Sequence, residues 1–294
     1  MTRSVTVLAT GAVTTLQDAG RPGQAELGIG RSGACDRASY RLANRLVGNA
    51  DQSAVLEVTF GGLHLRAEAD IMVATTGARC GGSSPHNAPV YLRRGEELQL
   101  GAPATGLRTY VAVRGGFGGD PVLGSRSTDV LSGLGPAPIS AGDVLEICEP
   151  DLPAPGVDVA PVPDPDEGDV TVRVVPGPRR DWFTNESWAV LVSEAYSVTS
   201  DSNRVGLRLD GEALERTRTD ELPSEGMVRG ALQIPPSGKP VLFLADHPVT
   251  GGYPVIAYVE DDDVDRCGQL RPGQVVRFTR HHGHEADWAR PSGT

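Results

Sequence analysis

The chain has 294 residues, of which 39% are hydrophobic and 22% charged, and its formal net charge is −11. This length allows two ordinary domains or one large one, and the composition is that of a globular protein. The acidic balance argues against nucleic acid and anionic membranes as partners. Apolar runs such as residues 241–245 are too short to span a bilayer, and the amino terminus lacks a signal-peptide core, so we expect a cytoplasmic protein.

Short stretches of apolar and β-branched residues, separated by Gly, Pro and Asp turns, predict strands along the whole chain. They lie at residues 5–8, 56–60, 63–67, 71–75, 98–100, 109–113, 144–147, 170–175, 197–199, 207–209, 231–234, 241–244, 255–259 and 275–278. Their spacing is short and irregular, and no long helices intervene at regular intervals. A parallel sheet of alternating strands and helices therefore does not fit, and the pattern indicates a mainly β protein.

A polar, glycine-rich segment at residues 14–49 follows the first strand. We expect it to bury little apolar surface, and loops that carry Asp, Arg, Ser and Asn on glycine turns are where binding and catalysis usually occur. Its candidate functional residues are Gln17, Asp18, Arg21, Ser32, Gly33 and Asp36. Neither a P-loop pattern nor a dinucleotide-binding GxGxxG pattern occurs there, so nucleotide binding by those routes is not expected.

Three helices are predicted. The first spans residues 37–47, and Asp36 before it is a good N-cap. The second begins at Thr184 or Asn185 and is expected to bury Trp188 and Leu191. The third has one or two turns and begins at residue 261 or 262.

The best domain boundary is residues 149–168, which are rich in Pro and Asp and show neither helical nor strand periodicity. Each half ends similarly, with a tight Gly turn that leads into an alternating strand, at residues 140–147 and 271–278. We therefore expect two related antiparallel β-barrels at residues 1–150 and 168–279, joined by a linker at 151–167 and followed by a polar tail at 280–294.

Polar clusters elsewhere are further candidates for chemistry. They contain Ser127 in a Gly-rich loop, Arg204 at a strand end, Gln233 within an apolar strand, and Asp246 followed by Gly251, Gly252 and Tyr253. Each has a structural alternative: a turn cap for Ser127, a surface charge for Arg204, a structural hydrogen bond for Gln233, and a plain hairpin at the glycine pair. Asp246 and His247 resemble part of a catalytic triad, but no GxSxG elbow accompanies them.

Metal and lysine chemistry are not expected. The four cysteines are scattered without a CxxC pair, and His281, His282 and His284 lie in the polar tail, so we predict no metal site. Lys239 is the only lysine and lies in a turn, which leaves hardly any candidate for Schiff-base chemistry.

Eight motifs in order carry a specific resemblance: TLQDAGRPG, GIGRSGACD, ANRLVGN, LEVTFGG, GSRSTD, SDSNRVGLRLDG, GALQIPPSGKP and DHPVTGGYP. Together they resemble the biotin-dependent carboxyltransferase family, which includes the C subunit of 5-oxoprolinase, allophanate hydrolase subunit 2 and the matching part of urea carboxylase. The resemblance covers roughly residues 3–279. It implies two cyclophilin-like barrels. Gly30 and Cys35 depart from the usual Pro and Met of the family, and glycine in place of proline loosens the loop.

The resemblance implies three possible functions. The first is a subunit of an ATP-dependent 5-oxoprolinase, which converts 5-oxo-L-proline to L-glutamate. The second is a carboxyltransferase subunit that moves CO2 from carboxybiotin to urea or a related amide. The third is a non-catalytic binding partner of a kinase-inhibitor protein. We expect the first, with activity only in the presence of partner chains.

The cofactors are expected to come with those partners. No biotinylation motif and no P-loop occurs, so ATP with Mg, or biotin, would be brought through companion subunits. The companions implied are a kinase-inhibitor-like chain, similar to allophanate hydrolase subunit 1, and a lactam-utilisation chain.

The site residues are expected to share one cleft. Asp246, Asp36 and Arg21 are the catalytic candidates, with the two carboxylates suited to handling a proton. The substrate-binding candidates are Gln17, Asp18, Ser32, Gly33, Ser127, Arg204, Gln233, Gly251, Gly252 and Tyr253. Arg21 and Arg204 offer positive forks for a substrate carboxylate. For Asp36, a purely capping role remains the alternative.

Overall fold

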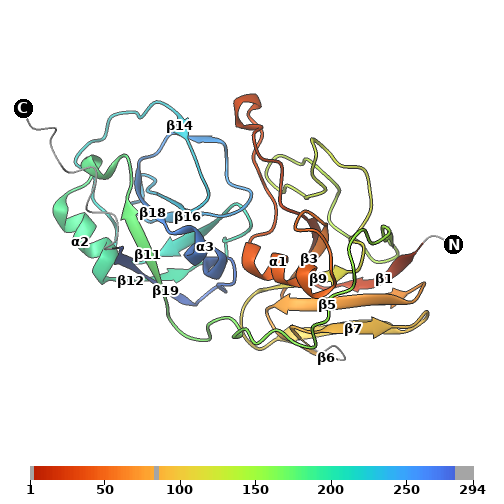
Figure 1. The fold of residues 1–294 in the computed structure, drawn as a ribbon. Coiled ribbons are helices and arrows are strands. Elements are labelled where there is room, and N and C mark those ends of the chain that lie inside the picture. Colours follow the sequence, from red (N-terminus) through yellow and green to blue (C-terminus); the bar gives the residue numbers. More distant parts are fainter. Residues whose placement is uncertain (1–2, 83–85, 282–294) are drawn as a thin grey trace, which may run out of the picture. The chain divides into compact units, whose positions relative to one another are not determined.

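The computed structural model describes residues 3–82 and 86–281, and these are mainly β-structure with short helices, as expected. The chain divides into two compact units (Figure 1). The first comprises Met1–Glu167 with Asp265–Arg271, and the second comprises Gly168–Val264 with Pro272–Thr294. Residues 265–271, which lie within the range predicted for the second barrel, therefore belong to the first unit.

Two five-stranded sheets form the first unit. One has the order β10-β1-β4-β8-β6 and the other has the order β2-β3-β9-β5-β7. Their strands are β1 (Ser4–Thr10), β2 (Val13–Gln17), β3 (Val55–Thr59), β4 (Leu63–Ala67), β5 (Ile71–Gly77), β6 (Cys80–Gly82), β7 (Pro89–Leu92), β8 (Glu97–Pro103), β9 (Arg108–Val113) and β10 (Val144–Glu146). All strand pairs described within these sheets are antiparallel.

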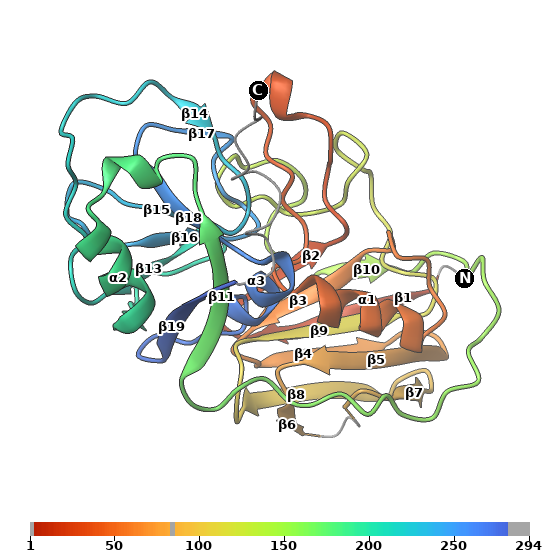
Figure 2. The same cartoon turned by 60° about the vertical axis from the view of Figure 1, so that its left-hand side comes forward.

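The central strands of the second sheet, β3, β9 and β5, are buried on both faces. Side chains alternate between the faces of a strand, so Val111 and Val113 of β9 join the core between the two sheets. Tyr110 and Ala112 point to the other face and pack with α1 (Arg37–Leu46). Figure 2 shows α1 lying across β3, β9 and β5. A strand covered on both faces reads as a continuous apolar run, which residues 110–113 of β9 show.

The second unit contains a closed seven-stranded barrel with the order β11-β18-β15-β16-β13-β12-β19. Its strands are β11 (Val170–Pro176), β12 (Ala195–Val198), β13 (Gly206–Asp210), β15 (Ala231–Gln233), β16 (Val241–Phe243), β18 (Val255–Val259) and β19 (Val275–Arg280). The short strands β14 (Glu225–Gly226) and β17 (Thr250–Gly251) form a separate two-stranded ribbon. Within the barrel β11 and β19 pair in parallel, and the other described strand pairs are antiparallel, so the barrel is mostly antiparallel, as expected.

The helices begin close to where the sequence predicts them. Besides α1, the described residues contain α2 (Asn185–Ser193), α3 (Asp261–Cys267) and two 3-10 turns, η1 (Ala25–Leu27) and η2 (Arg180–Trp182). The Thr184 hydroxyl accepts from the Ser187 N–H and caps α2. Leu191 is buried, whereas Trp188 is only half-buried; the Arg180 guanidinium lies over its ring, 5.3 Å from the ring centre.

The opening polar segment differs from the predicted loop in two ways. Val13–Gln17 forms strand β2, which pairs with β3 along its whole length. The sequence VTTLQ hides this strand because its threonines are polar, yet Thr14 and Thr15 are buried. The candidate residues that follow are also buried, although residues 25–28 between them are exposed.

The predicted linker lies against the first unit as an extended strap. The Ala160 N–H donates to the Asn87 carbonyl at 2.7 Å, and the Asp164 carboxylate pairs with Arg79 at 3.0 Å. Val157 and Ala160 pack against the apolar cluster beneath α1. The predicted tail begins within β19, and residues 282–294, including His282 and His284, lie outside the described residues.

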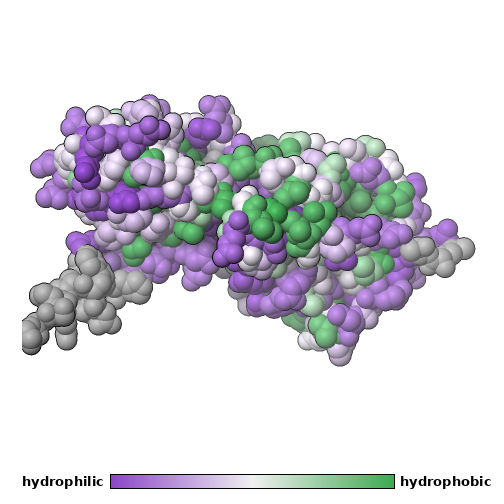
Figure 3. All heavy atoms as spheres, turned by 90° about the horizontal axis from the view of Figure 1, so that it is seen from above, coloured by the Kyte–Doolittle hydropathy of each residue, from purple (hydrophilic) through white to green (hydrophobic). Residues whose placement is uncertain are grey.

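Apolar side chains also occur on the surface. Figure 3 shows hydrophobic residues gathered in patches on the part of the drawn face that belongs to the first unit. Exposed large apolar residues of this unit include Leu27, Leu123, Val130 and Leu131. Contiguous exposed apolar surface is typical of interaction sites. Among the described residues, no helix combines the length and the hydropathy needed to cross a membrane.

Candidate functional site

The Asp18 carboxylate is the centre of a buried polar cluster in the first unit. The hydroxyls of Ser125 and Ser127 donate to its Oδ1 at 2.6 Å each, and the Gly20 N–H donates to the same oxygen at 2.8 Å. The Arg126 N–H donates to Oδ2 at 2.6 Å. The Ser127 hydroxyl also accepts from the Asp18 N–H at 2.9 Å. These bonds join the segment after β2 to the Gly-rich loop, so Asp18 holds the two loops together.

Arg21 and Gln17 extend this cluster around the backbone of residues 127 and 128. Arg21 Nη2 donates to the Ser127 carbonyl at 2.6 Å, and Gln17 Nε2 donates to the Thr128 carbonyl at 2.9 Å. Both side chains are almost completely buried. Arg21 Nη1 and Gln17 Oε1 have no hydrogen-bond partner among the described residues. A buried polar atom without a partner costs free energy, which marks this place as one where a polar ligand group would be favourable.

Ser32 and Gly33 form the turn opposite Asp18. Ser32 is buried at φ 55°, a left-handed conformation that is uncommon for a residue with a side chain, and its hydroxyl lies 3.4 Å from the Thr128 carbonyl. Gly33 has φ 96°, and a Cβ there would lie 3.0 Å from the Gly20 nitrogen. The glycine is thus required by the close approach of two backbones. Six predicted site residues, Gln17, Asp18, Arg21, Ser32, Gly33 and Ser127, therefore lie together in this unit.

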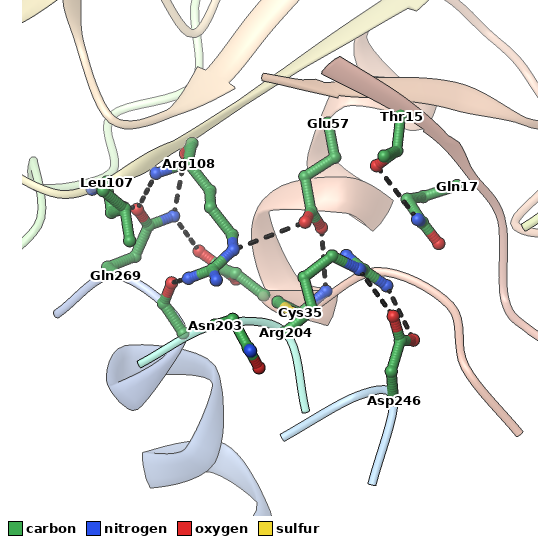
Figure 4. Close-up of polar contacts among 12 residues, drawn as sticks. Thr15, Gln17, Cys35, Glu57, Leu107, Arg108, Asn203, Arg204, Asp246 and Gln269 are labelled. Carbon is green, nitrogen blue, oxygen red and sulfur yellow. Dashed lines mark hydrogen bonds and ion pairs between the residues drawn. The ribbon is translucent and has the colours of Figure 1, made fainter. Parts of the chain in front are cut away.

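A second buried cluster, which the sequence patterns did not predict, lies under the start of α1. Residues 57, 108 and 110 fall on the strand face that α1 covers, so the side chains of Glu57, Arg108 and Tyr110 are enclosed. Glu57 Oε2 accepts from the Tyr110 hydroxyl at 2.8 Å and from the Cys35 N–H at 2.9 Å. Its Oε1 lies 3.4 Å from Arg108 Nε. Figure 4 shows Glu57 between Arg108 and Cys35.

Burial and the Glu57 charge raise the pKa of Tyr110 well above its ordinary value, so its hydroxyl stays protonated and donates. The sequence signals that could have revealed this cluster are a glutamate inside the apolar strand VLEVT and an arginine at the start of the apolar strand RTYVAV. Buried charges need partners, so each signal predicts the other.

Asp36 caps α1 and also anchors residues 265–271. Its Oδ1 accepts from the Ser39 N–H at 2.9 Å, and its Oδ2 accepts from the Ser39 hydroxyl at 2.6 Å and from Gln269 Nε2 at 2.7 Å. The Asp265 carboxylate also bonds to this helix start, through the N–H groups of residues 37 and 38. Desolvation by burial, and then the Asp265 charge, raise the pKa of Asp36. The capping alternative is thus observed, and a catalytic role for Asp36 remains a prediction.

Arg204 and Asp246 form a buried ion pair in the second unit. Arg204 Nε donates to Asp246 Oδ2 at 2.9 Å, and Nη2 donates to Oδ1 at 3.1 Å (Figure 4). The Asp246 N–H donates to the Arg204 carbonyl at 3.0 Å, so the two residues are joined through their backbones as well as through their side chains. The side chains are 6% and 0% exposed. The sequence predicts that Arg204 binds a substrate carboxylate, whereas in this structure its guanidinium binds Asp246.

Gln233, Gly251 and Tyr253 form a separate group in the same unit. Gln233 Nε2 donates to the Tyr253 carbonyl at 3.2 Å, and a Cβ on Gly251 would lie 2.6 Å from that nitrogen. Gly252 is exposed and the Tyr253 side chain is 44% exposed. The register pairs Gln233 with Val241, five residues before Asp246. A shared cleft for these residues and the Arg204–Asp246 pair stays a prediction.

Within the described residues, no group of three or more His, Cys, Asp and Glu side chains is arranged to hold a metal ion. Cys35 and Cys267 are buried and Cys80 is half-buried, and none of the cysteines forms a disulfide. Burial raises the pKa of the Cys80 thiol.

Comparison with known proteins finds a matching family model and similar proteins. A family model described as carboxyltransferase domain, subdomain A and B, matches residues 27–280. The C subunit of 5-oxoprolinase from Escherichia coli (strain K12) is 35% identical over 295 residues, which cover 97% of this chain and 93% of that protein. Urea amidolyase of Lachancea kluyveri is 33% identical over 305 residues, which cover 92% of this chain and 16% of that protein.

Two solved structures are similar throughout. The K. lactis urea amidolyase has a TM-score of 0.87 at 31% identity, over 95% of this chain and 19% of that chain. The protein TTHA0988 has a TM-score of 0.86 at 35% identity, over 95% of this chain and 55% of that chain. This chain thus spans about half the length of TTHA0988 and a smaller part of the urea amidolyase.

Proposed function

Because the chain belongs to the carboxyltransferase domain family, subdomains A and B, we propose that it is a subunit of an ATP-dependent 5-oxoprolinase. The observation that carries this proposal is the 35% identity to the C subunit of the Escherichia coli 5-oxoprolinase, which extends over 97% of this chain and 93% of that protein. A second relative with the same name, from Haemophilus influenzae, is 32% identical over 90% of this chain. The expected family resemblance is confirmed by these matches.

The proposed substrate is a small cyclic amide, and the proposed proton-handling group is the Asp246 carboxylate. Arg204 binds one lone pair on each oxygen of that carboxylate, which fixes its plane and balances its charge. An ionised carboxylate can accept the proton of a ring N–H or return a proton to the nitrogen when the ring opens. In the first unit, Arg21 Nη1 and Gln17 Oε1 offer a donor and an acceptor that match an amide.

Companion chains are part of the proposal. The relatives from Escherichia coli and Haemophilus influenzae are both named as subunits, and exposed apolar residues on the first unit offer surface for docking. We infer that a kinase-inhibitor-like chain and a lactam-utilisation chain complete the enzyme, and that Mg with ATP is bound mainly by them.

Carboxyl transfer to urea is the second candidate, favoured by the TM-score of 0.87 to the K. lactis urea amidolyase. In that reaction carboxybiotin on another domain or chain would supply CO2, and the same residues would orient the planar amide. The ureido or amide nitrogen would lose its proton to a carboxylate such as Asp246.

Co-purification of the chain with its two companions tests both candidates. The complex should form glutamate and ADP from 5-oxoproline and ATP, whereas the chain alone should not. Robust turnover by the isolated chain would contradict the proposed dependence on companions. Urea-dependent decarboxylation of carboxybiotin, without turnover of 5-oxoproline, would favour the second candidate instead.

A further inference from the structure

Arg216 of the second unit is a half-buried cation without a carboxylate partner among the described residues. Its Nη2 donates to the Ile234 carbonyl, and its enclosed Nε has no hydrogen-bond partner within residues 3–82 and 86–281. Burial lowers the pKa of Arg216, and the interaction with Tyr253 offsets this only in part. By contrast, the enclosed Arg204 and Arg229 of the same unit are paired with Asp246 and Asp261.

An aromatic ring and an amide lie beside this cation. The Arg216 guanidinium carbon lies 5.8 Å from the centre of the Tyr253 ring, and that ring is 44% exposed. Gln233 Nε2 donates to the Tyr253 carbonyl at 3.2 Å, which fixes the amide next to the same residue. Gly252 beside them is exposed, so its backbone is open to solvent. Cation, flat ring and amide therefore meet at one place on the second unit.

The adjoining ribbon does not neutralise Arg216. Glu225 of β14 pairs with Gly251 of β17, so its backbone adjoins the group. Its carboxylate, however, is bound by Arg179. Asp220 and Arg218, in the segment that follows Arg216, pair with one another at 3.9 Å in an exposed position. An incoming anion would thus find the Arg216 charge uncompensated.

We propose that Arg216, Tyr253 and Gln233 form a binding site for a small planar carboxylate, separate from the Arg204–Asp246 pair. A guanidinium binds a carboxylate through a planar fork, and the partly desolvated charge makes that pairing more favourable than at an exposed arginine. A flat group attached to the carboxylate would lie on the Tyr253 ring, and Gln233 would bind its polar edge. The site selects carboxylated ligands over neutral amides of the same shape.

Binding of 5-oxoproline and of 2-pyrrolidinone to the full chain tests this site, since the two ligands share a lactam ring and differ in the carboxylate. We expect 5-oxoproline to bind at least about tenfold more tightly and to shift the ring resonances of Tyr253. Arg216→Gln should remove that preference, whereas Arg218→Gln, the same change two residues away at an exposed ion pair, should keep it. Tyr253→Leu, at a partly exposed position, should weaken both ligands several-fold.

Thermal unfolding of each variant shows whether it is folded. Equal binding of 5-oxoproline by Arg216→Gln and by the original chain would overturn the proposal, and so would the absence of any preference in the original chain. The proposed 5-oxoprolinase activity is judged separately, by turnover of the assembled complex, so either inference can fail while the other stands.

Discussion

Replacing Arg204 by methionine should strongly destabilise the second unit, because the Asp246 carboxylate would stay buried without its counterion. The pair is held by two hydrogen bonds of 2.9 and 3.1 Å, and its side chains are 6% and 0% exposed. Removing one partner of such a buried pair costs about 3–5 kcal/mol of unfolding free energy. Removing both charges, as in R204M/D246L, should cost much less, because no charge is left uncompensated.

The measurement is urea unfolding followed by the fluorescence of Trp182 and Trp188, which lie in this unit. Arg208→Met on the exposed side of β13 is the matched control and should change the unfolding free energy by less than about 0.5 kcal/mol. The pairing argument is refuted if R204M is as stable as R208M, or if the double variant is less stable than R204M.

Asp246→Asn separates structure from chemistry at the same position. Asparagine keeps the shape and one acceptor but leaves the buried Arg204 charge uncompensated, so the cost in unfolding free energy should approach about 3–5 kcal/mol. The assembled complex should nevertheless lose activity by about 10²–10⁴-fold, since a general acid or base contributes about that much. If the variant folds, assembles with its companions and keeps near-full activity, Asp246 does not handle the proton.

Three further results are expected. Gly251→Ala should destabilise the β14–β17 ribbon by about 1–3 kcal/mol in thermal unfolding, because the alanine Cβ would lie 2.6 Å from Gln233 Nε2. Gly252→Ala is the control and should be tolerated, because a Cβ there would lie 3.7 Å from the nearest atom. Ser127→Ala removes two hydrogen bonds to Asp18 and should lower the unfolding free energy by about 1–3 kcal/mol in urea, while the same change at the exposed Ser132 should not. Because the pKa of Asp36 is raised in the folded protein, this carboxyl contributes stability at pH below its ordinary pKa of 3.8, and the contribution is lost as the pH rises through the raised pKa. Asp36→Asn should therefore flatten the dependence of the unfolding free energy on pH in this range. An unchanged slope would contradict the raised pKa.

Local features of the sequence determined which elements form. Asp36 and Thr184 are oxygen-bearing residues before helical patterns, and both cap helices in the structure. The apolar runs of β5 and β9 form strands because β-branched side chains suit a sheet that is covered on both faces. The ordered motifs also predicted the family, since motifs such as SDSNRVGLRLDG and DHPVTGGYP combine turn glycines with polar residues in a specific order.

Only the tertiary structure decided which of these elements are partners. Arg204 and Asp246 are 42 residues apart, and Glu57 and Arg108 are buried together because β3 and β9 pair in one register. The parallel pairing of β11 with β19, and the inclusion of residues 265–271 in the first unit, depend likewise on contacts between distant segments. Alternation along a strand tells which side chains share a face, but strand pairing and register are chosen by the whole packed core. For that reason the sequence identifies Asp246 as a candidate, but only the fold shows that Arg204 is its partner.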